Sequence, residues 1–347
     1  MSQRDDLVKE QVVFLSRTPE QLRALRGREL YEKLSELDLT HGQYFRALDT
    51  SLEDYCAAEF GIDLKRITVE RFFHSDPSAK WLFPEVVRDA VLSGMRHKPA
   101  YPSLIARDER INGAVYDMPY VNEEEEEEAL RPVAEGAAIP ESTIRYGDRV
   151  VRVDKKGRGV IASYEVIRRM SVDLLRIHLR RMGERLGRNL DARLAHVLAF
   201  GDSSGATAPA IMDSEESGSW CYRDLVIGYL QLALSNHFTP THVLTGPQAS
   251  VALLTMEEMS NAMLFDFART GALPTPLGMK VVPMPDQPED RITILDANYA
   301  VQKLTEQDLL LENDKIIHQQ WDRAYLTVIT DFAILYEHAR VVLSNAS

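Results

Sequence analysis

The chain has 347 residues, a formal net charge of -13 and 45% hydrophobic residues. This composition suffices for two or three packed domains and excludes a disordered protein, and the acidic balance argues against DNA binding as the primary role. Cys56 and Cys221 stand alone without a metal-ligand spacing, which fits a reducing cytosol and excludes a disulfide framework. The polar N-terminus and the lack of an 18-residue apolar run predict neither a signal peptide nor a membrane span.

Residues 1–66 predict a helical N-terminal region. Thr40-His41-Gly42 marks a helix start or break within it. Farther along, Pro84 opens a short helix that Gly94 closes. The apolar residues of the N-terminal region recur at helical spacing and include Leu22, Leu25, Leu30, Leu34 and Leu37.

The stretch from Asn122 to Ser163 predicts an extended two-stranded arm. Val150, Val151 and Val153 precede Gly157, and Val160 and Ile161 follow it, so we expect strands on both sides of a glycine-marked irregularity. An isolated pair of strands is marginally stable in water. We therefore expect the arm to lie against another subunit.

Residues 164–200 predict one long helix, which is the spine of the subunit. Apolar residues recur there at helical spacing, Ser163 stands at the N-cap position, and Gly201 follows the last apolar residue. A single helix of this length would extend about 50 Å. Gly183 and Gly187 interrupt it, and one of them indicates the close approach of another backbone or a bend, with simple tolerance of glycine as the alternative.

After a loop over 201–219, helices and strands alternate without a repeat. We expect helices over 222–236 and 247–254, and the remaining apolar runs predict strands. Those runs are THVLTG (241–246), LGMKVVPMPD (277–286), RITILDA (291–297), 324–336 and 340–343. The sequence therefore predicts an α+β fold.

Two patterns could carry catalysis or metal binding, and we interpret both as structural. Gly201 to Gly205 spell GxSxG, but a nucleophile elbow needs a strand before the serine, and here a long helix precedes it. His237 and His242 are too few for a metal site. No phosphate-binding glycine motif occurs. We thus expect no catalytic residue, cofactor or metal, whereas a hydrolase or metalloenzyme would bring such groups together in a pocket.

Opposite charges are segregated along the chain. From Tyr164 to Phe200 eight arginines and four acids give a net charge of +4, whereas the chain as a whole carries -13. The acidic run is either a solvated loop or a contact with basic residues of a neighbouring subunit. The candidate contact residues are Glu123, Glu124, Glu125, Glu126, Glu127, Glu128, Arg168, Arg169, Arg180 and Arg181.

Five segments in a fixed order carry a resemblance to a known family. They are AEGAAIPEST (134–143), GDSSG (201–205), THVLTGPQASVALLTM (241–256), PTPLGMKVVPMPD (274–286) and LTVITDFAILYEHARVVL (326–343). This order resembles the major capsid proteins of tailed bacteriophages, whose fold is shared with the encapsulins. The similarity extends over roughly residues 72–345.

The resemblance implies the tailed-phage capsid fold, with the domains that this fold contains. They are the N-terminal helical region (1–66), an N-terminal arm with a short helix (67–116), an extended β-hairpin arm (117–163), a peripheral domain with the spine helix (164–219), an axial domain (220–310) and C-terminal strands of the peripheral domain (311–347).

The resemblance also implies a function. Such chains form pentamers and hexamers that close an icosahedral shell around double-stranded DNA, with portal, scaffold or decoration proteins as further partners and no membrane. The shell would assemble in the host cytoplasm and end as the virion capsid. An encapsulin shell that encloses a cargo enzyme is the alternative.

Some relatives join a lysine of the arm covalently to an asparagine near the C-terminus, assisted by a glutamate. In this chain Ile139 and Ala324 stand at the first two positions and Asp331 near the third. The resemblance therefore implies a shell without this crosslink.

Overall fold

The computed structural model divides the chain into two compact units. Unit 1 contains residues 1–99, 156–189 and 308–328, and unit 2 contains residues 100–155, 190–307 and 329–347. No helix among the described residues is long and apolar enough to cross a membrane. The structure describes residues 22, 25, 27–37, 39, 41–75, 79–96, 99–121, 133, 135, 144–205, 207, 209, 211–215, 218–257, 276–316 and 320–345.

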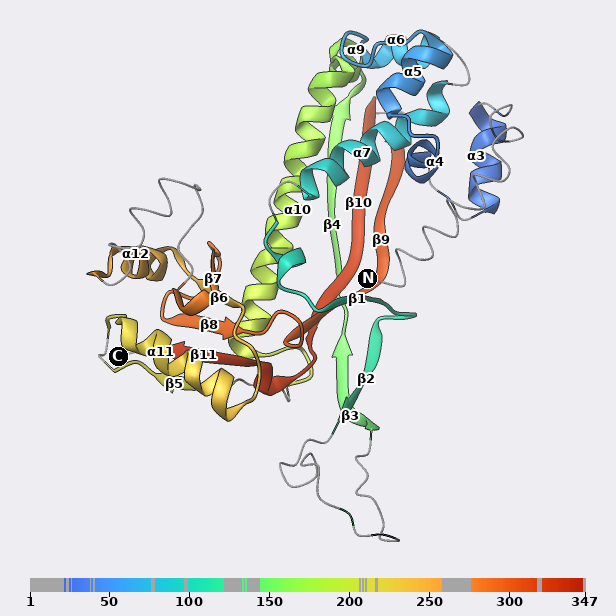
Figure 1. Cartoon of the computed structure of the whole chain (residues 1–347). Coiled ribbons are helices and arrows are strands. Elements are labelled where there is room, and N and C mark those ends of the chain that lie inside the picture. Colours follow the sequence, from blue (N-terminus) through green and yellow to red (C-terminus); the bar gives the residue numbers. More distant parts are fainter. Residues whose placement is uncertain are drawn as a thin grey trace. The chain divides into compact units, whose positions relative to one another are not determined.

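Short helices form the N-terminal part of unit 1 (Figure 1). They are α3 (Gly27–Glu36), α4 (His41–Ala47), α5 (Leu52–Phe60), α6 (Val69–Ser75), the 3-10 turn η1 (Ala79–Leu82) and α7 (Phe83–Met95). Leu22, Leu30 and Leu34 are buried in a core that also contains Val172. The predicted helical region is confirmed where it is described, and its apolar face packs on its own chain.

The spine consists of two helices instead of the single predicted one. They are α9 (Tyr164–Arg169), which Ser163 caps as predicted, and α10 (Val172–Phe200). Met170 has an extended backbone with φ -73° and ψ 136°. The backbone N–H of Val69 donates to its carbonyl oxygen at 3.0 Å, and the N–H of Val172 donates to Ile67 at 3.0 Å. The prediction of one helix was wrong because these long-range backbone bonds replace two helical ones.

The glycines of α7 and α10 allow the two helices to touch. A Cβ on Gly183 would overlap the carbonyl oxygen of Val91, and one on Gly94 would overlap that of Arg180. The close approach predicted for Gly183 is therefore confirmed. Gly94 does not end α7, which continues to Met95. That prediction was wrong because Gly94 provides a helix contact instead of a cap.

The strands of the predicted arm form, but they do not pair with each other. The strand β3 (Ile144–Arg152) pairs antiparallel with β2 (Val115–Val121). The strand β4 (Lys155–Ser163) is instead an edge of a four-stranded sheet of order β1-β9-β10-β4. Its other members are β1 (Arg107–Arg110), β9 (Val301–Ile316) and β10 (Trp321–Ile334). The prediction missed this because hydrophobic alternation identifies a strand without identifying its partner.

Unit 2 also contains a five-stranded sheet of order β5-β11-β8-β6-β7 (Figure 1). The strands are β5 (Ile211–Asp213), β6 (His242–Thr245), β7 (Lys280–Pro283), β8 (Arg291–Leu295) and β11 (Arg340–Ser344). The helix α11 (Tyr222–Leu230), its π-helical continuation η3 (Gln231–Ser235) and α12 (Pro247–Thr255) share one apolar core with the sheet. The predicted helices and strands of this region are confirmed. The remaining 3-10 turns are η2 (Tyr101–Ser103), η4 (Pro276–Gly278) and η6 (Glu337–Ala339).

Candidate functional site

Of the predicted contact residues, the structure describes the side chains of three, on α9 and α10. Glu123 to Glu128 lie outside the described residues, as does the side chain of Arg168. Arg169, Arg180 and Arg181 are exposed. Because successive residues of a helix are about 100° apart, Arg180 and Arg181 extend to different sides of α10. Arg181 also pairs with Glu184 of its own helix at 2.6 Å.

Another spine arginine, which the sequence places in the same basic block, acts within unit 1. The side chain of Arg176 is only 12% exposed and pairs with Glu53 at 2.5 Å and with Asp89 at 3.4 Å. These carboxylates lie on α5 and α7, so Arg176 joins three helices. The sequence did not distinguish it from the exposed arginines because helical spacing alone does not show where the neighbouring helices pack.

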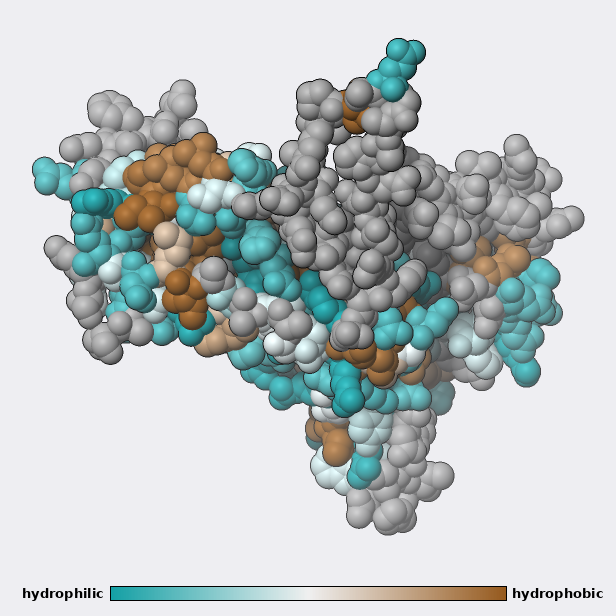
Figure 2. Space-filling view, turned by 90° about the horizontal axis from the view of Figure 1, so that it is seen from below, coloured by the Kyte–Doolittle hydropathy of each residue, from teal (hydrophilic) through white to brown (hydrophobic). Residues whose placement is uncertain are grey.

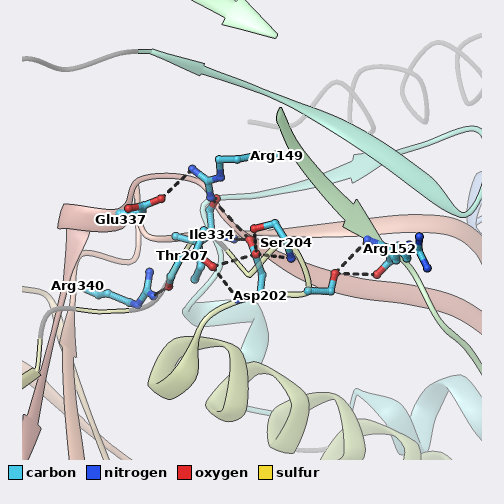
Figure 3. A network of polar contacts seen from close by, with 9 residues as sticks. Arg149, Arg152, Asp202, Ser204, Thr207, Ile334, Glu337 and Arg340 are labelled. Carbon is cyan, nitrogen blue, oxygen red and sulfur yellow. Dashed lines mark hydrogen bonds and ion pairs between the residues drawn. The ribbon is translucent and has the colours of Figure 1, made fainter. Parts of the chain in front are cut away.

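A buried polar network in unit 2 surrounds the GxSxG loop (Figure 3). Gly201 and Gly205 turn the loop with positive φ values of 103° and 72°, a conformation that glycine adopts readily. The loop directs the carboxylate of Asp202 inward, where it accepts hydrogen bonds from the backbone N–H of Ile334 at 3.0 Å and from Thr207 Oγ1 at 2.9 Å. These donors satisfy the hydrogen-bonding capacity of a carboxylate that is buried away from water.

Arg149 connects β3 to this network (Figure 3). Its guanidinium donates to the carbonyl oxygen of Ile334 at 2.9 Å. It also lies 3.7 Å from Asp202 and 3.4 Å from Glu337. The side chains of Arg149 and Asp202 are 12% and 0% exposed, so their contact is shielded from water and is stronger than a surface pair, whereas Glu337 is 38% exposed. Arg149 therefore fastens the arm strand to the turn between β10 and β11.

Arg340 is the buried cation of the same network. Its Nε donates to the carbonyl oxygen of Leu198 at 3.0 Å, and its Nη2 donates to that of Thr207. Burial lowers the pKa of Arg340 to about 10, although nearby Glu337 and Asp202 oppose this shift. Arg340 thus stays charged at neutral pH and holds the C-terminal end of α10 against β11.

The serines of the GxSxG loop hold backbone in place. Ser203 Oγ accepts from the backbone N–H of Arg152 at 3.0 Å and donates to its carbonyl oxygen at 3.3 Å. The backbone N–H of Ser204 donates to Asp202 at 3.0 Å, and its hydroxyl donates to the same carboxylate. The loop follows a helix and contacts a strand end. This is the arrangement of a structural loop and differs from a nucleophile elbow.

A second buried ion pair fixes the end of α10 to β10. Arg193 donates from Nε and Nη2 to the two oxygens of Asp331 at 2.8 and 3.0 Å. The side chain of Asp331 is 1% exposed, and its hydrogen bond raises the pKa of Arg193. Asp331 stands near the position of the assisting glutamate in crosslinking relatives. Here its carboxylate is occupied by a guanidinium, while Ala324 lies in β10 and Ile139 lies outside the described residues.

The two histidines considered for a metal site have separate surroundings. His242 Nδ1 lies 2.9 Å from Thr241 Oγ1, and burial lowers its pKa. His237 is exposed with a positive φ of 60°. In the part of the chain that the structure describes, no group of three or more His, Cys, Asp or Glu residues is placed to hold a metal ion.

The comparisons relate this chain to known proteins in sequence and in fold. A family model described as phage capsid protein matches residues 147–306. That range contains the spine, the GxSxG loop and most of the five-stranded sheet. This part of the chain is similar to the phage capsid protein family. A comparison with curated protein sequences finds no match.

Solved structures of capsids and of a virus-like particle share the fold of this chain. The capsid of an empty GTA particle matches with a TM-score of 0.55 at 14% identity, covering 73% of this chain and 91% of the other. The capsid of the Cyanophage P-SCSP1u matches with a TM-score of 0.53 at 14% identity, covering 72% and 88%. A virus-like particle from Pyrococcus furiosus matches with a TM-score of 0.51 at 14% identity, covering 75% and 98%. The predicted capsid fold and the resemblance are confirmed.

Proposed function

We propose that this protein is a major capsid protein that assembles through pentamers and hexamers into an icosahedral shell enclosing double-stranded DNA. The observation that carries the proposal is the family match over residues 147–306 on a chain with the capsid fold. The shell would assemble in the host cytoplasm and become the virion capsid. Portal, scaffold or decoration proteins are the further partners that such a shell uses.

The five-fold symmetry of a similar capsid supports the pentamer. The native GTA capsid, computed with C5 symmetry, matches the chain with a TM-score of 0.55 at 15% identity. Closed rotational symmetry needs two different surface patches on each copy that fit each other. Repeated weak contacts of this kind suffice, because each subunit makes several of them at once.

An apolar stripe on α11 and its continuation η3 supports self-association. Ile227, Leu230 and Leu234 follow one another at helical spacing and are 38%, 44% and 66% exposed. Figure 2 views the side of unit 2 where α11 lies in Figure 1, and hydrophobic side chains gather there. A contiguous apolar surface of this kind typically marks a protein contact. We assign this contact to a second copy of the chain.

The hydrogen bonding of the GxSxG loop supports a structural role without catalysis. Ser203, Ser204 and Asp202 are all bonded within unit 2, and none of them is positioned beside a histidine base in a described contact. We therefore propose that the protein is not an enzyme. Incubation of purified particles with chromogenic ester and peptide substrates tests this, and turnover abolished by Ser203→Ala would overturn it.

The acidic run at Glu123 to Glu128 is the remaining proposed contact. We assign it to basic residues on the spine of a neighbouring subunit. Arg169 and Arg180 suit it best, because Arg181 already pairs with Glu184. Each exposed pair contributes only about 0 to 1 kcal/mol and is screened by salt. Changing all six acids to Gln should lower both the assembly yield and its salt sensitivity, and unchanged assembly would indicate a solvated loop.

Electron microscopy and light scattering of the purified full-length protein test the proposed function. We expect closed particles of megadalton mass whose nucleic acid resists added nuclease. The double variant Leu230→Glu/Leu234→Glu should fold but form fewer particles, whereas Leu174→Glu, which is 44% exposed on α10, is the matched control. A chain that stays monomeric or dimeric under assembly conditions overturns the proposal. Particles that hold a cargo enzyme and no DNA would indicate the encapsulin alternative.

A further inference from the structure

One face of α10 carries a straight line of basic side chains. His178, Arg181, Arg185 and Arg188 are separated by three, four and three residues, so they follow one another along the same side of the helix. All four are exposed. At 1.5 Å per residue, the line from Arg181 to Arg188 extends about 10 Å. All four residues belong to unit 1.

Most of these basic side chains form no ion pair with the described part of the chain. Among the described residues, Arg185 and Arg188 have no ion-pair partner, and Arg181 pairs only with Glu184 of its own helix. Arg176 shows the contrast, because it is buried between Glu53 and Asp89 on other helices. The exposed arginines therefore hold their charge at the surface without a structural task in unit 1.

The local charge opposes that of the chain as a whole. From Ile177 to Asn189, beyond the buried Arg176, there are four arginines and one acid, Glu184, which gives a net charge of +3 in a chain of -13. A basic stripe on an otherwise acidic protein is the electrostatic footprint of a polyanion. Arginine also matches the geometry of phosphate, since its planar fork can donate two parallel hydrogen bonds to one group.

We propose that the line formed by Arg181, Arg185 and Arg188, with His178 at its end, contacts the phosphate backbone of double-stranded DNA. This inference rests on the proposed function and deepens it, because it assigns the DNA contact of the shell to one face of α10. A rigid helix holds the guanidinium groups in a row, and DNA presents one negative charge per ~1.7 Å of its axis. Such a contact reads no base sequence. It is therefore suited to a shell that encloses DNA of any sequence.

The test compares two triple variants of the full chain. One is Arg181→Gln/Arg185→Gln/Arg188→Gln. The matched control is Lys65→Gln/Arg66→Gln/Arg71→Gln, which removes the same charge from exposed residues elsewhere in unit 1. Binding to two 30-base-pair duplexes of unrelated sequence is measured by fluorescence anisotropy over a range of salt concentrations. Light scattering verifies that the protein is used below the concentration at which particles form. Thermal melting verifies that both variants fold.

We expect the α10 variant to bind both duplexes at least about tenfold more weakly than the unmodified chain at low salt. The plot of the logarithm of the association constant against the logarithm of the salt concentration has a negative slope. Its magnitude should decrease by about 3, since each phosphate contact contributes ~0.9. The control should keep most of the affinity. If the unmodified chain binds no duplex, if the α10 variant binds like the unmodified chain, or if the control loses as much affinity, the inference is wrong.

Particle formation separates this inference from the proposed function. If the α10 variant keeps its DNA affinity but no longer forms particles, the arginines contact acids of a second copy, and the inference is overturned while the shell proposal stands. If the unmodified chain forms no particles at all, the shell proposal fails, whatever the duplexes show.

Discussion

The buried carboxylates Asp331 and Asp202 are each held by specific partners. Asp331 is almost completely buried and faces Arg193 across two hydrogen bonds. Asp202 likewise collects donors from Ile334 and Thr207. A buried charge that loses its partner is costly, whereas replacing both partners by apolar groups can be nearly neutral.

Arg193→Ala should destabilise the protein by about 3 to 5 kcal/mol, because it leaves the Asp331 carboxylate buried and unpaired. The double variant Arg193→Leu/Asp331→Leu should recover much of this loss. Arg185→Ala is the matched control and should change stability by less than about 0.5 kcal/mol, since that side chain is exposed. Urea unfolding measures all three. A wild-type midpoint for Arg193→Ala would contradict the assigned role of the pair.

His41 should make the helical part of unit 1 sensitive to acid. Burial lowers its pKa from 6.5 to about 4, and the ring stacks on Tyr31 with centroids 5.8 Å apart. The unfolded chain therefore takes up a proton below pH 6.5, while the folded chain stays neutral until about pH 4. Stability is thus complete above pH 6.5 and is lost as the pH falls toward 4, by roughly 3 kcal/mol for a shift of this size.

The measurement is the urea midpoint of wild type and His41→Leu at pH 7, 5.5 and 4.5. Subtracting the stability of His41→Leu from that of wild type at each pH removes the contribution of the carboxylates. His237→Leu serves as an exposed control. The stability difference between wild type and His41→Leu should shift in favour of the variant as the pH falls. A constant difference at the three pH values would show that His41 does not titrate with folding.

At the scale of elements, glycine decides how the helices of unit 1 pack. The helices α7 and α10 meet at Gly94 and Gly183 with backbone against backbone. Close packing of this kind has no room for a methyl group. The break at Met170 has a comparable origin, because backbone bonds to Ile67 and Val69 compete with helix continuation there.

Gly183→Ala distinguishes packing from helix propensity. Propensity alone favours alanine by about 1 kcal/mol. The clash with the Val91 carbonyl oxygen should instead destabilise the protein by about 1 to 3 kcal/mol. Gly187→Ala is the control in the same helix, since its Cβ would lie 3.0 Å from the Met95 oxygen and needs only a small adjustment. Thermal melting decides, and a stabilised Gly183→Ala variant would refute the close contact.

At the scale of the whole molecule, the N-terminal helices are part of the folded subunit. Leu30, Leu34 and Phe72 are buried in one core with Val86 and Val172. Val172 belongs to the spine, so removing residues 1–66 would uncover part of the spine. Short helices are also unstable without such a partner.

We therefore predict that residues 1–66 remain on the assembled subunit. Intact-mass analysis of chains from mature particles should give a mass near 39.3 kDa.

Boiling in detergent should release single chains, because Ile139 and Ala324 cannot form the amide crosslink. A ladder of covalent oligomers would contradict this expectation. A loss of about sixty residues in the intact-mass analysis would contradict the retention of residues 1–66.

The sequence by itself determined the types of most elements. Helical spacing with the Ser163 cap indicated the spine, and the glycine of the α7 contact was visible as a costly residue at position 183. The order of short segments indicated the capsid fold. The spine and its glycine are local features, because the residues that carry them lie within one helix, whereas the order of segments is read along residues 134–343.

The tertiary structure alone decided which segments meet. The strand β3 pairs with β2 instead of β4, and Arg149 and Arg340 join Asp202 from positions 53 residues before it and 138 after it. Nothing in the spacing of these residues distinguishes them from exposed arginines such as Arg185. The reason is physical: burial and pairing depend on surfaces contributed by distant segments, and only the folded chain brings those surfaces together.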